Sequence, residues 1–517
     1  MVNQMTRTNV RRGQDWFSQM QRHFQNAEYR DAATVYDGVA EVGGERPNDA
    51  ILLRARLFLK LDSHRVVPFL LKEKLNRPSA TQIARREMYL GTGYSRLGDF
   101  GQADNHYREA GMTFTDGAPF AELAAHITRR YLDERDFSAA EEWQKKSEID
   151  RTRTGKIRSE HLLSYIFARR QRYEDQARSI MHVLQLIGDK IDEYREDWYA
   201  AVHTLSVLAR ELPLQEAAQM AKEAVDADVY WSEDFVVSRF QALKGVAWCQ
   251  ALAGDELSCL RYLRLAQHLR VSPVWQTILY LDRSHFASIV GEHQWAKNEF
   301  DAAVDVAEAI PWDETSGEER IALLLLAELA TRHAPKSAPF YIARFNNLGK
   351  LRSNLQHFAF DERLQAMASY AAGIVKLSLG SDTAAEDLRD AWVVFDRIGY
   401  DARAALTALG LHRATNKSRW LHLAEDKLER YPNSWIARGL TEIPKQSNEE
   451  RLPLSAMQES VTSLVCEGRS TDEIAEKLGI SRNTVLNHLK VVYRKLGVNS
   501  RQGLVVEAHR RRLFGRP

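Results

Sequence analysis

Small and aromatic residues recur at helical spacing through most of this chain. In the clearest stretch, residues 88–110, Tyr89–Gly91 come before the turn Leu97–Phe100, and Tyr107 follows that turn by two helical windings. No run between residues 13 and 440 alternates with period two for long enough to form a sheet. The pattern therefore predicts a curved, almost entirely helical array over residues 13–440.

Weaker copies of this turn recur along the same region. They lie at Glu28-Tyr29, Asp136-Phe137 and Arg172-Tyr173, near Pro213, at Gly254-Asp255, near Gln294-Trp295 and at Gly380-Ser381. The spacing, roughly 35 to 45 residues, resembles the tetratricopeptide pattern, in which small residues let paired helices cross closely and aromatic residues fill the gaps. The resemblance implies a solenoid whose aromatic residues mostly form the core. Its concave face would bind a peptide, a protein partner or a small ligand.

The last part of the chain has a different organisation. Residues 441–452 are polar, include the helix-stopping Pro444 and show no apolar period, so we interpret them as a linker. Cap chemistry then bounds four short helices within residues 453–517. Their limits are predicted at Ser455 (with Gln458) to Gly468, Ser470 (with Glu473) to Gly479, Ser481 to Gly497, and from Ser500 onward.

The two middle helices fit a helix-turn-helix. Counting Thr471 as the first position, Ala475 is fifth, where the helices touch, Gly479 is ninth, where a tight turn favours positive φ, and Val485 is fifteenth, in the shared core. The second helix has an apolar stripe of Val485, Leu489, Val492 and Leu496 that is expected against Ile474, Leu478 and Ile480. Its other side carries Asn483, Leu486, Asn487, Lys490 and Arg494, a polar and basic face suited to the major groove.

At these positions the region resembles the LuxR-type family of DNA-binding domains. The matching residues are Leu454-Ser455, Glu473-Ile474-Ala475, Leu478, Ile480-Ser481, Thr484-Val485, His488-Leu489, Tyr493-Arg494-Lys495-Leu496-Gly497-Val498 and Ser500-Arg501. The resemblance implies that Leu486, Asn487 and Lys490 face bases. It places a second set at phosphates or in support of that surface, namely Arg482, Asn483, Thr484, His488, Arg494 and Lys495.

Two departures from the family pattern change what is expected. Met457-Gln458 stands where family members often carry Arg-Glu, which loosens a salt bridge inside the domain. Leu486 stands where they often carry Lys, which removes a cation from the groove.

The fourth helix makes the dimer contact in this family, which here points to Leu504, Val505 and Ala508. Helix-turn-helix proteins commonly pair to bind two half-sites about one helical turn apart, so a homodimer on duplex DNA is expected. The alternative is that these three side chains only close the core of their own domain.

Charge is unevenly divided along the chain. Residues 453–517 contain 11 Lys and Arg against 6 Asp and Glu, a net of +5, whereas the rest of the chain has a net of −4. This asymmetry supports a nucleic-acid partner for the C-terminal region. The three cysteines form no CxxC pair, which fits a reducing cytoplasm. No apolar segment has the length of a membrane span, and residues 1–12 do not resemble an export signal, so neither export nor a membrane anchor is expected.

Catalytic motifs are missing from the sequence. There is no P-loop, no HExxH and no GxSxG, and the histidines are scattered. Catalysis in the array would require a pocket of converging ionisable groups, and the pattern predicts none. We therefore expect no enzyme activity, no cofactor and no metal.

The sequence predicts an all-α protein, with a tetratricopeptide-like solenoid followed by a four-helix LuxR-type domain. The predicted function is that of a cytoplasmic, nucleoid-associated transcriptional regulator whose solenoid senses a ligand or partner, with RNA polymerase a further candidate partner. The alternative is a solenoid adaptor for which the helix-turn-helix is only a DNA tether or a protein contact.

Overall fold

In the computed structural model, the described residues are 16–41, 46–227, 229–315, 319–351, 362–441, 454, 456–496, 498 and 500–510. Regular structure in these segments is helical throughout, and none of them contains a strand. The fold is all-α, as predicted. Among the same residues, no helix is long and apolar enough to cross a membrane.

The array consists of the helices that precede residue 442. They are α2 (Trp16–Gln25), α3 (Tyr29–Glu41), α4 (Asn48–Leu61), α5 (Val66–Lys72), α6 (Ala80–Arg96), α7 (Phe100–Gly111), α8 (Gly117–Glu134), α9 (Phe137–Ser147), α10 (Arg153–Arg169), α11 (Tyr173–Ile187), α12 (Arg195–Glu211), α13 (Gln215–Asp226), α14 (Val236–Ala253), α15 (Glu256–Gln267), α16 (Pro273–Ile289), α17 (His293–Glu308), α18 (Ile321–His333), α19 (Ala338–Leu351), α20 (Glu362–Ser378), α21 (Ala384–Arg397), α22 (Asp401–Thr415), α23 (Arg419–Leu428) and α24 (Trp435–Thr441).

Consecutive helices pair, and the turn between α6 and α7 shows how the sequence sets the pairing. Gly98 has a φ of +81° after α6, and the Asp99 carboxylate accepts a hydrogen bond of 3.1 Å from the Gln102 amide at the start of α7. At Gly91 an added Cβ would lie 2.8 Å from the Tyr107 ring, so the helices cross closely because this position has no side chain. The predicted roles of the small and aromatic residues are confirmed here.

The other predicted turns also separate paired helices. Asp136 caps α9 and Asp255 caps α15, each through a 3.0 Å bond from a backbone amide three residues later. The turn predicted near Gln294-Trp295 falls at residues 290–292, directly before α17.

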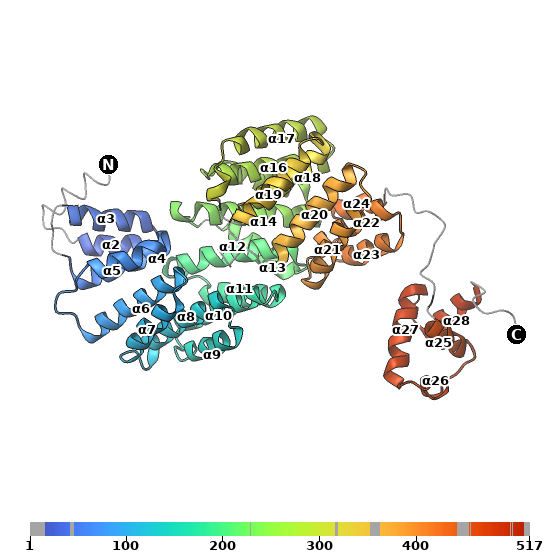
Figure 1. Ribbon diagram of the computed structural model, residues 1–517, viewed down its shortest axis with the longest axis horizontal. Coiled ribbons are helices and arrows are strands. Elements are labelled where there is room, and N and C mark those ends of the chain that lie inside the picture. The colour runs from blue at the N-terminus through green and yellow to red at the C-terminus, as the bar shows by residue number, and fades with distance from the viewer. Residues whose placement is uncertain are drawn as a thin grey trace.

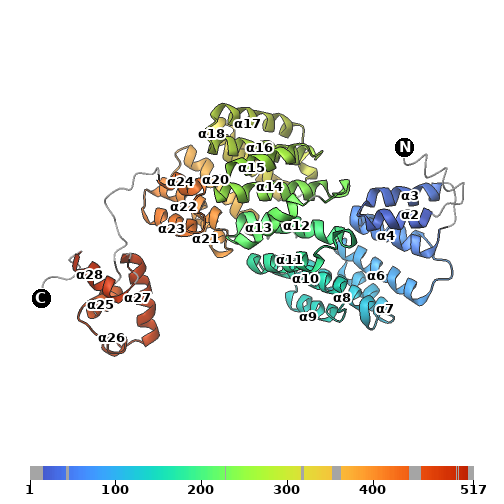
Figure 2. The ribbon, with the colours of Figure 1, turned by 180° about the vertical axis from the view of Figure 1, so that it is seen from behind.

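The stacked pairs curl until segments far apart in sequence touch (Figures 1 and 2). Near the N-terminus, Ser232 Oγ donates a 2.8 Å hydrogen bond to the Ala27 carbonyl, and Arg30 Nε lies 3.1 Å from Asp234 Oδ1. In the second half, α12 contacts α22 and α14 contacts α24. The solenoid thus closes on itself twice, with α12 shared between the two closures.

Four further helices form the C-terminal domain, α25 (Ala456–Cys466), α26 (Thr471–Leu478), α27 (Arg482–Leu496) and α28 (Arg501–Arg510). Their shared core is a single apolar cluster that includes Val461, Leu464, Ile474, Val485 and Leu489. The predicted linker after residue 441, the cap at Ser455 and the stop at Gly497 lie outside the described residues.

Candidate nucleic-acid interface and ligand cavity

The α26–α27 turn has the geometry that its sequence predicts. Ser470 and Glu473 form a reciprocal capping box at the start of α26, with bonds of 3.3 and 2.7 Å. Gly479 ends the helix with a φ of +65°, a conformation that few residues other than glycine adopt without strain. The Ile480 amide then bonds to the Ala475 carbonyl at 3.0 Å, which fixes the direction in which α27 leaves.

The inner face of α27 forms the core of the domain. Val485, Leu489, Val492 and Leu496 are all buried, together with Ile474 and Ala475 of α26, and Leu478 and Ile480 are partly buried against them. Of the residues assigned to the helix-turn-helix core from the sequence, Ile474, Ala475, Val485 and Leu489 are buried, whereas Gly479 is exposed in the turn. The packing holds α27 at a fixed angle to α26 and leaves its opposite side open.

The outer face of α27 is exposed to solvent. Its exposed residues are Arg482, Asn483, Leu486, Asn487, Lys490 and Arg494. Leu486 is 47% exposed. All three side chains that the family resemblance implies at the bases are therefore on this surface.

Other residues predicted to contact phosphates also make contacts within the domain itself. Thr484 is half-buried, and its amide donates to Ser481 Oγ at 3.1 Å, so it belongs to the cap of α27. His488 is also half-buried. Lys495 Nζ donates a 2.7 Å hydrogen bond to Gln458 Oε1, which ties α27 to α25. The loosened salt bridge expected at Gln458 is thus replaced by a charge-to-amide bond.

The fourth helix, α28, turns two of its three predicted dimer residues inward. Leu504 is 0% exposed and Ala508 2% exposed, whereas Val505 is only partly buried. Leu504 packs in the same cluster as Val485 and Leu489. This burial favours the alternative that Leu504 and Ala508 close the domain's own core, and it leaves Val505 as the residue at which a dimer contact can be tested.

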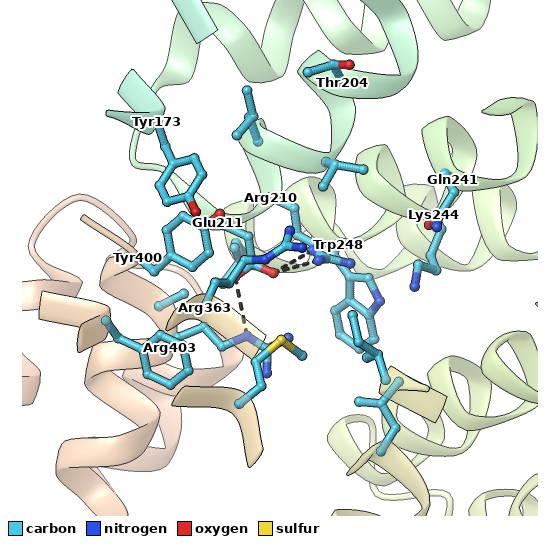
Figure 3. A pocket seen from close by; sticks show the side chains of 18 of the residues that line it. Tyr173, Thr204, Arg210, Glu211, Gln241, Lys244, Trp248, Arg363, Tyr400 and Arg403 are labelled. Carbon is cyan, nitrogen blue, oxygen red and sulfur yellow. Dashed lines mark hydrogen bonds and ion pairs between the residues drawn. The ribbon is translucent and has the colours of Figure 1, made fainter. Parts of the chain in front are cut away.

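A cavity of about 520 Å³ lies in the second closure of the array. Its walls include residues of α10 to α12, α14, α16, α18, α20 to α22 and α24. Contacts across large sequence separations border it: the ring centroids of Tyr173 and Tyr400 lie 5.2 Å apart, and those of His285 and Trp435 also lie 5.2 Å apart. Figure 3 shows charged side chains of separate helices pointing toward one another inside it.

Glu211, at the end of α12, is the centre of this charged group. Arg210 Nη2 lies 2.6 Å from its Oε1, and Arg403 Nε of α22 lies 3.3 Å from its Oε2 (Figure 3). Burial by itself would raise the pKa of Glu211, but the two guanidinium groups outweigh burial and lower that pKa to about 2. The carboxylate is therefore charged at neutral pH, and it joins helices that are about half the array apart in sequence.

A second ion pair lies on the α14 wall. Lys244 Nζ is 3.5 Å from Asp282 Oδ2, and the Trp248 indole N–H donates to Asp282 Oδ1 at 3.0 Å. Both charged side chains are buried, and burial lowers the pKa of Lys244 despite the neighbouring carboxylate.

The sequence pattern predicts no pocket of converging ionisable groups in the array, and the lining of this cavity corrects that expectation. In the sequence, Arg210 and Glu211 look like an ordinary charged helix end before Pro213. Arg403 looks like one more polar position in the period of a helix. The one signal available was the charged pair Arg210-Glu211 between the short apolar runs 207–209 and 212–214. Nothing in the sequence indicates the closure that brings α22 into contact with α12.

One acidic cluster elsewhere has a metal-like composition. The ligand atoms of His23, Glu28 and Asp31 lie within 4.8 Å of one another. His23 Nδ1 is already 2.7 Å from Glu28 Oε2, and Asp31 is exposed, so the cluster is accounted for as a surface ion pair.

Comparison with known proteins adds one family match. Residues 452–508 match the family described as "Bacterial regulatory proteins, luxR family". No curated protein gives a significant match to the chain. The apo form of the quorum sensor NprR from B. thuringiensis is 13% identical, with a TM-score of 0.40 over 68% of this chain and 100% of that one. The APC/C hetero-tetramer of Cut9 and Hcn1 is also 13% identical, with a TM-score of 0.29 over 95% of each chain.

The family match covers the same helices whose cap, turn and core geometry are described above. Residues 452–508, which follow a tetratricopeptide-like solenoid, are a DNA-binding domain of the luxR family of bacterial regulatory proteins.

Proposed function

We propose that this protein is a sequence-specific transcriptional regulator, in which the domain from residue 453 onward binds promoters and the array up to residue 440 binds a ligand or partner. The observation that carries the proposal is the outer face of α27, where polar, basic and apolar side chains are exposed above a sealed core. A rigid helix with such a face fits the major groove and can read base edges. A regulator of this kind acts at the nucleoid, with RNA polymerase a candidate partner.

Within that face we assign base recognition and phosphate contact to different residues. Asn487 and Lys490 lie on its central part, where an amide can pair with adenine and an ammonium can donate to guanine. Arg494 is exposed one winding further on, where a recognition helix commonly leaves the groove and meets the backbone. Lys495 is assigned a supporting role because its ammonium is bound to Gln458.

Replacing Asn487 with Ala is expected to cost roughly 1–3 kcal/mol on the operator and little on random duplex, because a base contact is lost. Replacing Arg494 with Ala should weaken both duplexes about equally and reduce the salt slope by about one unit. The operator is first selected from a random duplex library with the full chain. Binding is then measured at three salt concentrations on operator and scrambled duplexes.

Leu486→Lys is the companion variant. It should raise binding to scrambled duplex and reduce discrimination, because it adds a cation to the groove without adding a base-specific contact. Equal losses on both duplexes for Asn487→Ala would contradict the placement of α27. A wild-type protein with no preference for any sequence would instead favour the adaptor, in which the domain is only a tether.

We further propose that the protein binds its operator as a homodimer through α28. Because Leu504 and Ala508 are buried, the partly buried Val505 is the residue of the three at which a dimer contact can be tested. Val505→Glu is expected to abolish cooperative binding to a two-half-site operator and to keep binding to a single half-site, as measured by gel shift. A melting curve of the variant controls for folding. Unchanged cooperativity in a folded variant would move the dimer contact elsewhere.

A further inference from the structure

We propose that Leu486 recognises the 5-methyl group of a thymine and so selects thymine at one fixed position of the bound sequence. The inference deepens the proposed function and rests on it, because it names the chemical feature of DNA that one side chain of α27 contacts. It stands on the position of Leu486 in α27, on the polarity of its neighbours and on the chemistry of the base edges.

Leu486 lies in the middle of the exposed face of α27. It follows Asn483 by three residues and precedes Lys490 by four, so the three side chains follow one line along the helix. It is also the fifth residue of α27, which begins at Arg482, and the residues near the start of a recognition helix are those that meet base edges. The leucine therefore lies among the side chains that are expected at the bases.

Leu486 is the one apolar side chain on this face. Every residue of α27 is described, and its other five exposed residues are polar or charged. The apolar residues Val485 and Leu489 are 0% and 4% exposed and belong to the core of the domain. Leu486 is not part of that cluster, and its 47% exposure leaves it available to the groove.

The major groove offers an apolar side chain one apolar partner among the four ordinary bases. Adenine, guanine and cytosine present hydrogen-bond donors or acceptors there, whereas thymine presents O4 and a methyl group on C5. A leucine held against a polar base edge would exclude water without replacing the lost hydrogen bond, which costs free energy. Against the methyl group it buries apolar area instead. Attraction and desolvation therefore favour the same base.

The test starts from the operator that the full chain selects and replaces one thymine at a time with deoxyuridine, which lacks only the methyl group. At the thymine that Leu486 contacts, this replacement should lower the affinity about fourfold, the ratio that corresponds to one buried methyl group. At the other thymines it should have little effect. Fluorescence anisotropy at a single salt concentration measures the ratio, because the duplexes carry the same charge.

Two variants of the protein assign the effect to Leu486. The Leu486→Ala side chain ends at Cβ, too short to keep the contact, so this variant should bind the thymine and deoxyuridine operators almost equally. Leu486→Met keeps an apolar tip of similar volume and should retain most of the preference. Leu257→Ala is the matched control, because it removes a leucine that is 84% exposed on α15 of the array. It should keep the full preference for thymine.

Methylated cytosine gives a second, independent readout. Replacing the contacted thymine with cytosine removes the methyl group and puts a donor amine in the place of O4. 5-Methylcytosine then restores the methyl group alone. It should recover about fourfold of affinity for the wild type and almost none for Leu486→Ala.

The outcomes separate this inference from the function on which it rests. A wild-type protein that selects no sequence would sink the regulator, and the methyl contact with it. A selected operator without a fixed thymine, or one that no deoxyuridine weakens, would overturn the methyl contact and leave the regulator intact. So would a deoxyuridine effect that is the same for the wild type and Leu486→Ala, in proteins shown by circular dichroism to be folded.

Discussion

Replacing Gly245 with Ala is expected to destabilise the array by about 3 kcal/mol or more, a large effect for a single methyl group. Gly245 lies within α14, where an added Cβ would be 2.4 Å from the Ser206 carbonyl oxygen and 2.6 Å from the carbonyl carbon of α12. Both atoms belong to backbone, so no side-chain rotation can relieve the overlap, and α14 must move away from α12. A fall in the urea midpoint, followed by circular dichroism, measures the cost.

Gly101→Ala is the matched control, because this glycine also lies in a helix, α7. The nearest atom to its added Cβ is the Asp99 carboxylate at 3.8 Å, which is ordinary contact. Alanine favours helix over glycine by roughly 0.5–1 kcal/mol, so this variant should be neutral or more stable. Similar midpoints for the two variants would show that α12 and α14 are not packed backbone to backbone.

The second large effect is a loss of stability in acid that depends on Glu211. Its pKa is about 2 in the folded array, against an ordinary value of 4.5. The stabilisation is therefore fully present above pH 4.5 and is lost as the pH falls toward 2, because the unfolded chain takes up the proton first. For so buried a carboxylate the loss is on the order of 3 kcal/mol. Urea unfolding at pH 5, 4 and 3 measures it.

A variant separates this carboxylate from the others. Glu211→Gln should be less stable than the wild type at pH 5 and should lose less of its stability between pH 4.5 and 3. Glu216→Gln, at an exposed position of the neighbouring α13, should keep the wild-type slope. If Glu211→Gln followed the wild-type slope as well, the Arg210 and Arg403 contacts would not hold the carboxylate in its charged form.

Two histidines, the buried His161 and the partly buried His285, begin the loss at higher pH. Burial, followed by the nearby Arg332, lowers the pKa of His285 to about 3, and burial followed by Arg129 lowers that of His161 to about 4. A depressed folded pKa gives stability that is present above pH 6.5 and falls as the pH drops below it. The stability curve should therefore already decline between pH 6.5 and 4.5, before Glu211 contributes.

The sequence was informative wherever a structure is decided by neighbours in the chain. The turn at Gly98-Asp99, the close approach at Gly91 and the α26–α27 turn each follow from the φ preference, cap chemistry or size of one or two residues. The apolar stripe of α27 is readable for the same reason, because it depends on helical periodicity alone.

The closure of the array could not be predicted from the sequence. Closure depends on the crossing angles of many successive helix pairs. A small change in each of these angles would separate α12 from α22. The contacts of Glu211 are therefore determined by the accumulated crossing angles and not by the spacing of residues in the sequence. The burial of Leu504 and Ala508 was similarly undecided, because an apolar helix face fits a domain core and a dimer contact equally well.

The position of α24, the last helix of the array, bears on how the protein would be controlled. Trp435 and Ile436 of α24 line the cavity, and α24 ends at Thr441, shortly before the DNA-binding domain begins. Any change in operator affinity that a cavity ligand produces must be returned in full, since coupling between two sites on one molecule is reciprocal. Operator DNA would then be an effector of the cavity, and the same ligand would be held with different strength by promoter-bound and free protein.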